Sequence, residues 1–461
     1  MQMDANVDTL SLSLARWVEA LRYEDLPPEV IHHIRRSLLD YLGVAIRGAS
    51  SRVPRILLQY LVASEGKGGA SVLGTDQGLS SANAALANGT AAAALELDDG
   101  HAKAAVHLGA VSFPAILATA EERGSTSRDV ILAAAAAYEV ASRLAMAADR
   151  AARRGFNNTP LIGGFAAAAG VAKILGGDAR TIAHALGLAG STTGGLFDYH
   201  GGWLDSWCVN TGRTSREGLL CANLAASGIA GPLDIFHGPR GFAVAFTDGE
   251  FDGNAVLRSI GQEWRMLETY IKPYPCCRRL HSPIDAVLSL RPKVGDIDAV
   301  ERIVVETSAD SARLDRKDFD SVSAAQMSIP YGVAVALIHG APTLEHFEAD
   351  VREDLRIRRL ADLVEVRKSD DPDVADRQSS ARVSLSIGGV TSGVTVEEPS
   401  GNPANPVDDG ALEEKFRQLV EPVIGGSATT RLAERVWSFG DVRHEPEEGG
   451  ELHFLGSLHA R

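Results

Sequence analysis

Aromatic residues and cysteine are both scarce in this 461-residue chain. Aromatic residues make up only 6% of it, so a core must be built mainly from Ala, Leu, Val and Ile, and small side chains favour closely packed helices. The four cysteines include no CxxC pair, and the neighbours Cys276 and Cys277 are poorly placed for a mutual bridge. This pattern excludes a disulfide framework and a zinc-finger arrangement.

Positive charge is also in deficit, since 45 Lys and Arg stand against 60 Asp and Glu, a formal net charge of −15. Such a chain lacks the broad basic face that nucleic-acid binding needs, and an anionic ligand would need a local cluster of cations. The N-terminal stretch has acids and no cationic start before an apolar segment, and no apolar run is long enough for a bilayer span. We therefore expect a cytoplasmic protein with neither a nucleic-acid nor a membrane partner.

Helix-forming patterns fill the first 250 or so residues. In the first clear case apolar side chains recur at helical spacing, with Pro27 and Pro28 at the start and Gly48 at the end. A second helix is predicted to begin at Pro114 and to break at Gly124. Long alanine-rich helices are predicted over residues 127–154 and 159–177.

The pattern changes near residue 268. Residues 300–308, 361–369 and 381–398 are rich in β-branched residues or alternate apolar and polar side chains, which is typical of half-buried strands. The chain is too long for one ordinary core. We therefore predict a mainly α protein in which a large helical domain, built from residues 1–267 and 403–461, carries an inserted α+β unit at 268–402. The patternless acidic tail is expected to be poorly ordered.

Residues 95–109, LELDDGHAKAAVHLG, interrupt the alanine-rich sequence with titratable groups. Histidine and carboxylate together suit zinc or iron, but the spacing matches no metal motif such as HExxH. Asp98 or Asp99 could instead cap a following turn. An acid–base role needs a histidine of near-neutral pKa and a carboxylate to orient it, and His107 with Glu96 or Asp99 supplies both.

A second stretch, IKPYPCCRRLHSPID, gathers the cations Lys272, Arg278, Arg279 and His281 within ten residues. In an acidic chain this is a candidate carboxylate site, because arginine suits bidentate contact, although a basic surface loop has the same composition. The nearby cysteines are predicted to be buried structural thiols.

Two further segments carry polar groups beside apolar helices. Tyr331 could donate a proton at the start of an apolar helix or simply belong to the core. Asn157, Asn158 and Thr159 form an N-cap signature, and a helix N-terminus is also an anion site.

Taken together, these stretches resemble the MmgE/PrpD family, which includes 2-methylcitrate dehydratase, cis-aconitate decarboxylase and iminodisuccinate epimerase. The resemblance extends over almost the whole chain and rests on the K-P-Y-P-C-C-R and D-D-x-H…H stretches, among others. It implies a helical domain built from both chain ends with an inserted α+β lid, a homodimer, no metal or organic cofactor, and a site between the domains for small di- or tricarboxylates.

The resemblance also implies roles for individual residues. His107, Lys272 and Tyr331 match functional positions, and Glu96 stands where cis-aconitate decarboxylase has a functional aspartate. Two positions depart from the family pattern, because Asn157 replaces a histidine and Trp207 a lysine. These departures suggest a smaller, less charged or partly aromatic substrate. The predicted catalytic residues are His107, Lys272, Tyr331 and Glu96, and the predicted substrate contacts are Asp99, His101, Asn157, Thr159, Trp207, Arg278 and His281.

The predicted chemistry begins with a carbanion next to a carboxylate. A lysine and nearby arginines would stabilise the developing charge while the histidine moves the proton. Dehydration, decarboxylation and epimerisation can all use these groups. We expect a cofactor-independent lyase, with an epimerase or isomerase as the enzymatic alternative and a non-catalytic carboxylate binder as the alternative of another class.

Overall fold

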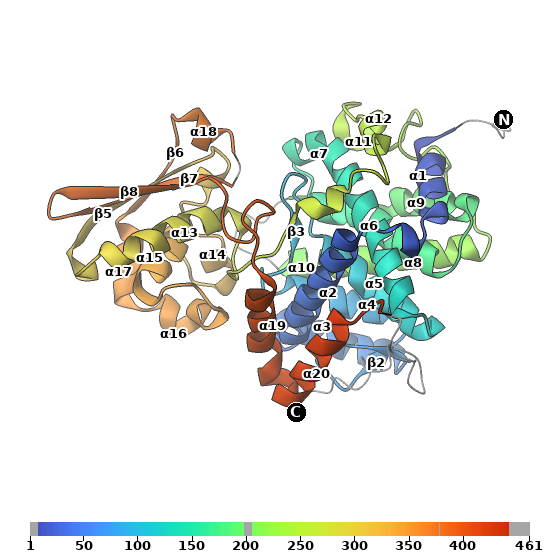
Figure 1. Cartoon of the computed structure of the whole chain (residues 1–461), viewed down its shortest axis with the longest axis horizontal. Helices are drawn as coiled ribbons and strands as arrows, with labels where there is room; N and C mark the ends of the chain where they lie inside the picture. The colour runs from blue at the N-terminus through green and yellow to red at the C-terminus, as the bar shows by residue number, and fades with distance from the viewer. Residues whose placement is uncertain (1–7, 198–204, 378, 442–461) are drawn as a thin grey trace.

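The computed structural model describes residues 8–197, 205–377 and 379–441. Within them the chain forms a larger helical part and a smaller α+β part that lie side by side, joined by a narrow region (Figure 1). The tail predicted to be poorly ordered lies mostly outside the described residues, as does part of the glycine-rich stretch before Trp207.

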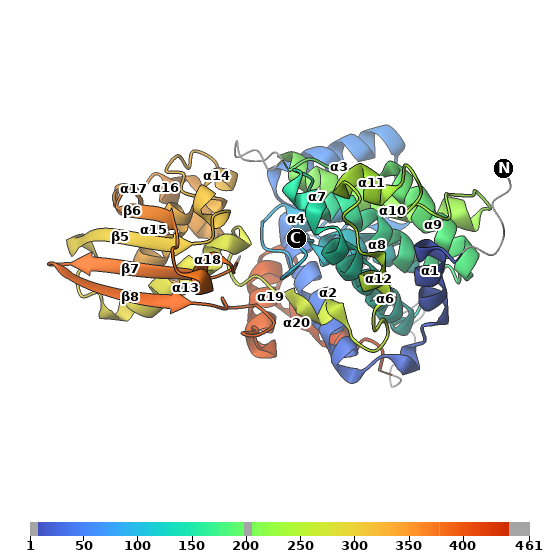
Figure 2. The ribbon, with the colours of Figure 1, turned by 90° about the horizontal axis from the view of Figure 1, so that it is seen from above.

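The helical part is built from the N-terminal half of the chain and closed by its C-terminal helices. The C-terminal helix α19 (Asp409–Ile424) packs against α2 (Pro28–Gly48), as the view from above shows (Figure 2). The N-terminal helices are α1 (Leu10–Ala20), α2 (Pro28–Gly48), α3 (Arg52–Glu65), α4 (Ser81–Ala93), α5 (Leu108–Arg123), α6 (Ser127–Ala147), α7 (Asp149–Arg153), α8 (Asn158–Ile174), α9 (Ala179–Thr192), α10 (Asp205–Ala226), α11 (Phe242–Thr247) and α12 (Gly253–Leu257). The C-terminal helices are α19 (Asp409–Ile424) and α20 (Gly426–Trp437), and two short antiparallel strand pairs, β1 (Ala70–Ser71) with β2 (Gly78–Leu79) and β3 (Gly100–His101) with β4 (Thr269–Tyr270), complete this part.

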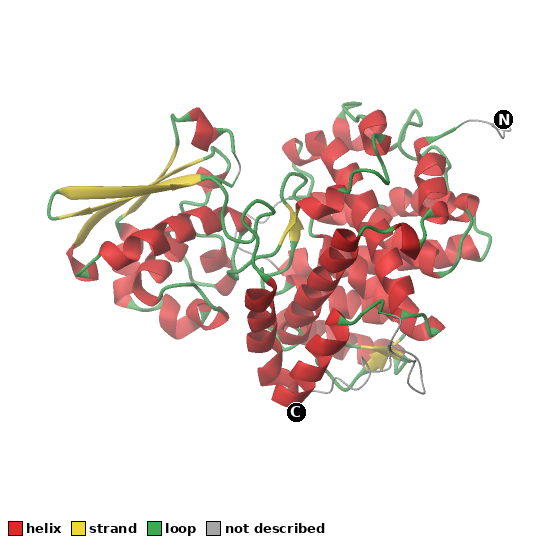
Figure 3. Cartoon of the chain, viewed as in Figure 1, coloured by secondary structure: helices red, strands yellow, loops and turns green. Residues whose placement is uncertain are grey.

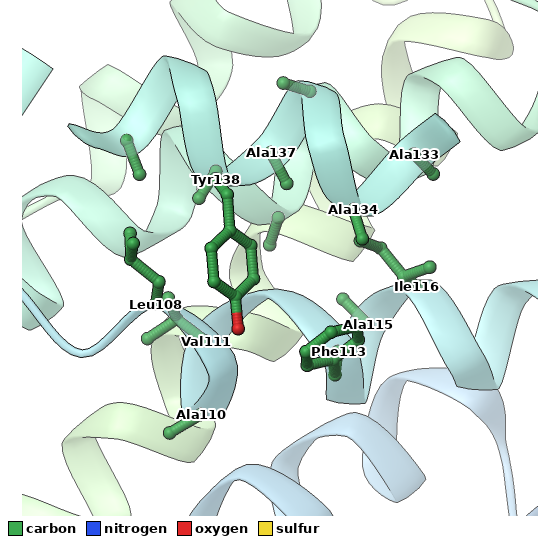
Figure 4. Close-up of a cluster of buried hydrophobic side chains, with 14 of the residues drawn as sticks. Leu108, Ala110, Val111, Phe113, Ala115, Ile116, Ala133, Ala134, Ala137 and Tyr138 are labelled. Atoms are coloured by element: carbon green, nitrogen blue, oxygen red, sulfur yellow. The ribbon is translucent and has the colours of Figure 1, made fainter. Parts of the chain in front are cut away.

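Small side chains let these helices pack closely, as the composition predicts. A Cβ atom on Gly89 of α4 would overlap the backbone of Gly212 in α10. At the α5–α6 contact, alanines lie between the large side chains of Tyr138 and Phe113 and aliphatic neighbours such as Ile116 (Figure 4). Contrary to the prediction, helix α6 is long and apolar enough to cross a membrane by length and composition. However, 83% of its most apolar 18-residue segment is buried inside the protein.

The predicted limits of α2 are confirmed, whereas the predicted start of α5 is wrong. Helix α5 begins at Leu108, and Pro114 lies inside it. The helix extends past this proline because its first turn is anchored from outside, where the Asp99 carboxylate accepts the backbone N–H of Gly109 at 2.8 Å. A cap contributed by a residue ten positions earlier carries no local sequence signal.

The smaller part packs helices against one face of a four-stranded sheet (Figure 3). The strands are β5 (Val300–Thr307), β6 (Val364–Lys368), β7 (Ala381–Ile387) and β8 (Val390–Val396), in the order β6-β5-β7-β8. The β5–β6 pair is parallel and the other two pairs are antiparallel. The helices are α13 (His281–Leu290), α14 (Val322–Gln326), α15 (Ile329–His339), α16 (Ala349–Arg352), α17 (Leu355–Asp362) and α18 (Pro372–Ala375).

Each part has its own hydrophobic core. One core uses residues as far as Ile271 and resumes at Leu412, whereas the other uses residues from Tyr274 to Leu385. The chain is therefore mostly helical with one smaller α+β part, as predicted. Movement of that part as a lid stays a prediction.

Candidate active site

The two-stranded ladder β3–β4 brings together two segments that are distant in the sequence. The strands are antiparallel, with Gly100 opposite Tyr270. Extending this register by two residues sets Asp98 opposite Lys272. Gly100 is required because a Cβ atom there would overlap the Tyr270 ring. The ladder therefore fixes the acidic segment before β3 against the lysine after β4.

Lys272 is a buried cation surrounded by acceptors from the opposite segment. Its Nζ donates to the carbonyl oxygen of Glu96 at 3.1 Å and to Glu96 Oε2 at 3.2 Å, and it lies 3.6 Å from Asp98 Oδ1. Burial lowers the pKa of Lys272, but the two carboxylates outweigh that effect and the net shift is upward. The ammonium therefore stays charged and is a fixed positive charge rather than a proton donor.

Glu96 adopts a left-handed backbone conformation, with φ 51°, which is uncommon for a residue that has a side chain. This conformation directs both its carbonyl oxygen and its carboxylate to Lys272. The backbone cost is on the order of 1 kcal/mol, and it persists because both contacts to the buried ammonium depend on it.

His107 faces the same acids from the N-cap position of α5. Its Nδ1 lies 3.0 Å from Asp98 Oδ2, so Asp98 bridges His107 and Lys272 with one oxygen to each. Burial lowers the pKa of His107, but the charge and hydrogen bond of Asp98 outweigh it and raise the pKa overall. Burial raises the pKa of Asp98, yet the charges of His107 and Lys272 lower it overall. The two groups therefore favour an imidazolium–carboxylate pair.

Trp207 and the start of α8 enclose this pair. The Trp207 ring meets the His107 ring edge-on, with the centroids 5.2 Å apart. Asn157 caps α8, as predicted, by accepting the backbone N–H of Thr159 at 2.9 Å. Thr159 Oγ1 in turn accepts the backbone N–H of His107 at 3.1 Å. The N-termini of α5 and α8 therefore meet beside the pair, an arrangement that favours an anion.

Asp99 and His101, predicted to contact substrate, are instead committed to the fold. Besides capping α5, Asp99 accepts the hydroxyl of Tyr138 at 2.9 Å, which confirms the capping alternative for this aspartate. His101 Nδ1 accepts two backbone N–H groups, and its Nε2 lies 3.0 Å from the carbonyl oxygen of Arg265. Burial raises the pKa of Asp99 to about 7 and lowers that of His101 to about 4, so both favour the neutral form.

The predicted cation cluster at 272–281 is divided by the fold. The Arg278 guanidinium donates to the carbonyl oxygen of Ser400 at 3.2 Å and lies 4.7 Å over the Tyr270 ring. His281 is fully buried, with Nε2 3.3 Å from the carbonyl oxygen of Cys276, and burial lowers its pKa well below the usual range. These two side chains contact the chain where it crosses between the parts, although Arg278 Nε and His281 Nδ1 have no hydrogen-bond partner among the described residues, and carboxylate binding by them stays a prediction.

Tyr331 lies in the core of the smaller part. Its hydroxyl donates to the carbonyl oxygen of His346 at 2.6 Å, and its ring packs between Phe319 and Phe347. This environment matches the core alternative for Tyr331. The proton-donor role stays a prediction without support from its contacts.

A cavity of about 720 Å³ lies between the two parts and adjoins this cluster. Leu95 precedes Glu96, Cys208 follows Trp207, and both line the cavity together with Gln326 of α14. The Gln326 amide donates to the carbonyl oxygens of Leu95 and Pro275, so the smaller part directly contacts both site segments. The cavity therefore reaches the chain next to Glu96 and Trp207, while its described lining does not include His107, Asp98 or Lys272.

The four cysteines are free, which confirms that they form no disulfide framework. Burial raises the pKa of Cys208 to about 12 and that of Cys221 to about 11, which makes both poor nucleophiles. Among the residues that the structure describes, no group of three or more His, Cys, Asp or Glu is arranged to hold a metal ion. A cofactor-free site stays a prediction.

Asp98 is the member of the candidate site that the sequence did not indicate, because Glu96 or Asp99 was expected to orient His107, whereas Asp98 contacts it. In an extended segment, adjacent residues turn to opposite sides, which separates Asp98 from Asp99. Glu96, in contrast, reaches Lys272 through its left-handed backbone. Glu96 and Asp98 both face Lys272, whereas Leu97 is buried and Asp99 turns to α5 and α6. Strict alternation through LELDDG would have separated the two aspartates.

The comparisons with known proteins match nearly the whole chain. The model of the MmgE/PrpD N-terminal domain matches residues 12–254, and that of the C-terminal domain matches residues 274–439. A cis-aconitate decarboxylase-like protein, oryM, from Aspergillus oryzae is 27% identical over 93% of this chain and 94% of its own length. Cis-aconitate decarboxylase of Aspergillus terreus is 28% identical over 94% of each chain, and that of Homo sapiens is 25% identical over 94% of this chain and 92% of its own.

Proposed function

Because the chain belongs to the MmgE/PrpD family, we propose that it is a lyase of the dehydratase or decarboxylase type that acts on a small carboxylic acid by proton transfer. The observation that carries this proposal is Asp98, which bridges His107 and Lys272 in a buried cluster. One acid thereby orients a proton carrier and a fixed positive charge toward a shared site.

The two cationic groups have different tasks in the proposed reaction. Lys272 stays charged and stabilises negative charge as it develops on the substrate carboxylate in the enediolate-like transition state. Asp98 holds the Nδ1 side of His107, which leaves Nε2 to exchange a proton with the substrate. In a dehydration, neutral His107 would first take the α-proton as the C–H bond breaks, and the resulting imidazolium would then give that proton to the departing hydroxyl, which leaves as water while the C=C bond forms.

Decarboxylation suits the protonated state of His107 best. The bond between the α-carbon and a carboxylate breaks, CO₂ leaves, and the electron pair remains on carbon until the imidazolium donates its proton there. A histidine whose pKa is raised enters such a reaction already protonated. The cis-aconitate decarboxylases among its relatives support decarboxylation as the reaction type.

The charge of the cluster favours a dicarboxylate over a tricarboxylate. Lys272 and a protonated His107 are balanced by Glu96 and Asp98, so the described cluster holds no surplus positive charge. An apolar ring, Trp207, closes one side of it. Helix N-termini at α5 and α8 can bind one carboxylate through backbone N–H groups. We therefore propose a substrate with fewer or partly masked carboxylates.

The two alternatives differ from this proposal in what they require. An epimerase needs proton carriers on both faces of the carbon, whereas the described cluster presents His107, whose pKa the neighbouring Asp98 raises, on one side. A non-catalytic binder needs no proton carrier at all. The homodimer and the cytoplasmic location stay predictions.

Deuterium incorporation tests the proposal. We expect the protein, incubated with a panel of di- and tricarboxylic acids in D₂O, to release CO₂ or water from one of them. In the decarboxylation case each CO₂ is matched by one deuterium in the product, detected by mass spectrometry. His107→Gln should lower the rate by about 100-fold or more, because the glutamine cannot carry the proton.

His184→Gln is the matched control, because His184 is also partly buried and bonded through one ring nitrogen, here to the carbonyl oxygen of Gly231. Its rate should equal that of the wild type. Binding of acids without exchange or turnover would establish the non-catalytic binder instead. Deuterium at the α-carbon of recovered, inverted substrate would establish the epimerase.

A further inference from the structure

Lys415 of α19 lies directly behind the candidate active site. Its side chain is 12% exposed, and its Nζ donates to Asp40 Oδ1 at 2.5 Å, to the carbonyl oxygen of Leu97 at 3.0 Å and to the carbonyl oxygen of Lys272 at 2.8 Å. One ammonium from the C-terminal helix therefore joins α2 to both site segments. None of these contacts involves an atom assigned above to the reaction.

The two carbonyl oxygens belong to the backbone that carries the reacting groups. Leu97 lies between Glu96 and Asp98, so its peptide groups set the direction of both carboxylates. The second carbonyl is that of Lys272 itself. The β3–β4 ladder pairs only two residues of each strand, and Asp98 and Lys272 lie two positions beyond its last pair. Lys415 supplies a connection across these segments where the ladder has already ended.

We propose that Lys415, fixed by Asp40, is a positioning residue that sets the distance between Asp98 and Lys272 and thereby keeps Asp98 on His107. This inference rests on the proposed function only for its kinetic consequence. Its structural consequence concerns the His107–Asp98 contact and holds whichever acid is the substrate.

Asp40 is the ion-pair partner that holds the Lys415 ammonium in place. It is almost fully buried in α2, and Lys415 is the partner of its Oδ1. Burial raises the pKa of Asp40, and the Lys415 charge opposes that rise. The pair therefore brings a cation to the back of the site without adding net charge to the interior.

Trp207 provides a direct readout of His107. An imidazolium quenches the fluorescence of an indole that it touches, and these two rings are 5.2 Å apart. The difference between the emission of the protein and that of its Trp207→Phe variant, followed against pH, gives the titration midpoint of His107. The groups that face His107 are Asp98, Lys272 and Glu96.

Lys415→Met is the informative variant because two effects have opposite signs. Loss of a nearby cation alone would raise the His107 midpoint, whereas displacement of Asp98 would lower it. We expect the midpoint to fall by about one pH unit. With an active substrate, kcat should fall about tenfold with little change in KM. Lys415→Arg, which keeps the charge and the donors, should restore most of both.

Lys173→Met is the matched control. The Lys173 ammonium also donates to three backbone carbonyl oxygens, those of Val18, Glu19 and Leu21, but it ties α8 to α1 away from the site. Its loss should lower the melting temperature and leave the His107 midpoint unchanged. Should Lys415→Met fail to fold, Lys415→Gln, which retains one donor group, must show the same downward shift.

A folded Lys415→Met or Lys415→Gln protein with an unchanged or higher His107 midpoint would overturn the positioning role and leave Lys415 a structural tie. Failure of the proposed function looks different. The wild-type protein would then turn over no acid, while the midpoint and its shift on loss of Lys415 remained measurable.

Discussion

The residues of the candidate site divide into those kept charged and those kept neutral. Burial alone would discharge them all, and the direction of each pKa depends on what else is near. Asp98 touches two cations and its pKa is lowered, whereas the adjacent Asp99 touches none and its pKa is raised to about 7. Two neighbouring aspartates therefore have opposite protonation preferences.

Asp99 makes stability depend on pH in a predictable direction. Its folded pKa, about 7, lies above the unfolded value, so folding favours the protonated form. This contribution is complete below the unfolded pKa and is lost as the pH rises through the folded one, between about pH 4 and pH 7. Asp99→Asn removes the penalty while still accepting the Gly109 N–H, and should stabilise the protein at pH 7 by as much as about 4 kcal/mol.

Urea unfolding at pH 4.5 and at pH 7 measures this effect. The free energy of unfolding of Asp99→Asn relative to the wild type should rise between the two pH values. An equal difference at both would mean that Asp99 is already ionised in the folded protein. Asp129→Asn is the matched control, because Asp129 likewise caps a helix, α6, but is exposed.

At the scale of elements, local signals predict local structure. The limits of α2 follow from a proline at its start and a glycine at its end, and the N-cap of α8 follows from Asn157. The start of α5 was mispredicted because its anchor, Asp99, lies outside the helix. The start of a helix cannot be predicted from residue spacing when its capping side chain comes from another part of the fold.

In the candidate site, too, some features could be predicted from the sequence and others depend on the fold. His107, Lys272 and Glu96 could be named from sequence and do lie together. Arg278 and His281 share the composition of a carboxylate site, but the crossover needs them for its own carbonyl oxygens. Composition shows which side chains are chemically able to bind an anion, whereas only the fold shows which of them lie next to His107.

The loop that leads from β8 back to α19 in the helical part requires glycine at position 401. Its φ is 90°, and a Cβ atom would overlap the carbonyl oxygen of Ile271, the residue before Lys272. Gly401→Ala should therefore cost about 2–4 kcal/mol of stability, from backbone strain plus displacement. It should also reduce turnover, because the displaced segment carries Lys272, the group proposed to stabilise the developing charge. Chemical unfolding and steady-state rates measure both.

Gly249→Ala is the control that measures backbone strain alone, without displacement of a neighbouring segment. Gly249 also has a positive φ, 84°, but a Cβ atom there would meet no atom within 4 Å. It should cost about 1 kcal/mol and leave turnover unchanged. Equal losses of stability in the two variants would show that the close approach of Gly401 to Ile271 does not contribute to the cost of Gly401→Ala.

At the scale of the whole molecule, the site depends on two separate cores and the strands between them. Lys415 holds the site segments from the helical part, and Gln326 holds them from the α+β part. The cavity beside them is lined from both parts. Its volume therefore changes with any movement of one part against the other, which couples access to the relative position of the two cores.

Narrowing this cavity should slow the reaction without weakening either core. Val322, the first residue of α14, lines the cavity and is 40% exposed, so Val322→Trp adds bulk there without emptying a packed site. We expect kcat/KM to fall about tenfold or more while the melting temperature stays within about 2 °C of the wild type. Val244→Trp in α11, at a side chain 53% exposed outside this cavity, should change neither. An unaltered kcat/KM in Val322→Trp would mean that substrate reaches His107 by another route, and equal losses in both variants would indicate a general effect of a surface tryptophan.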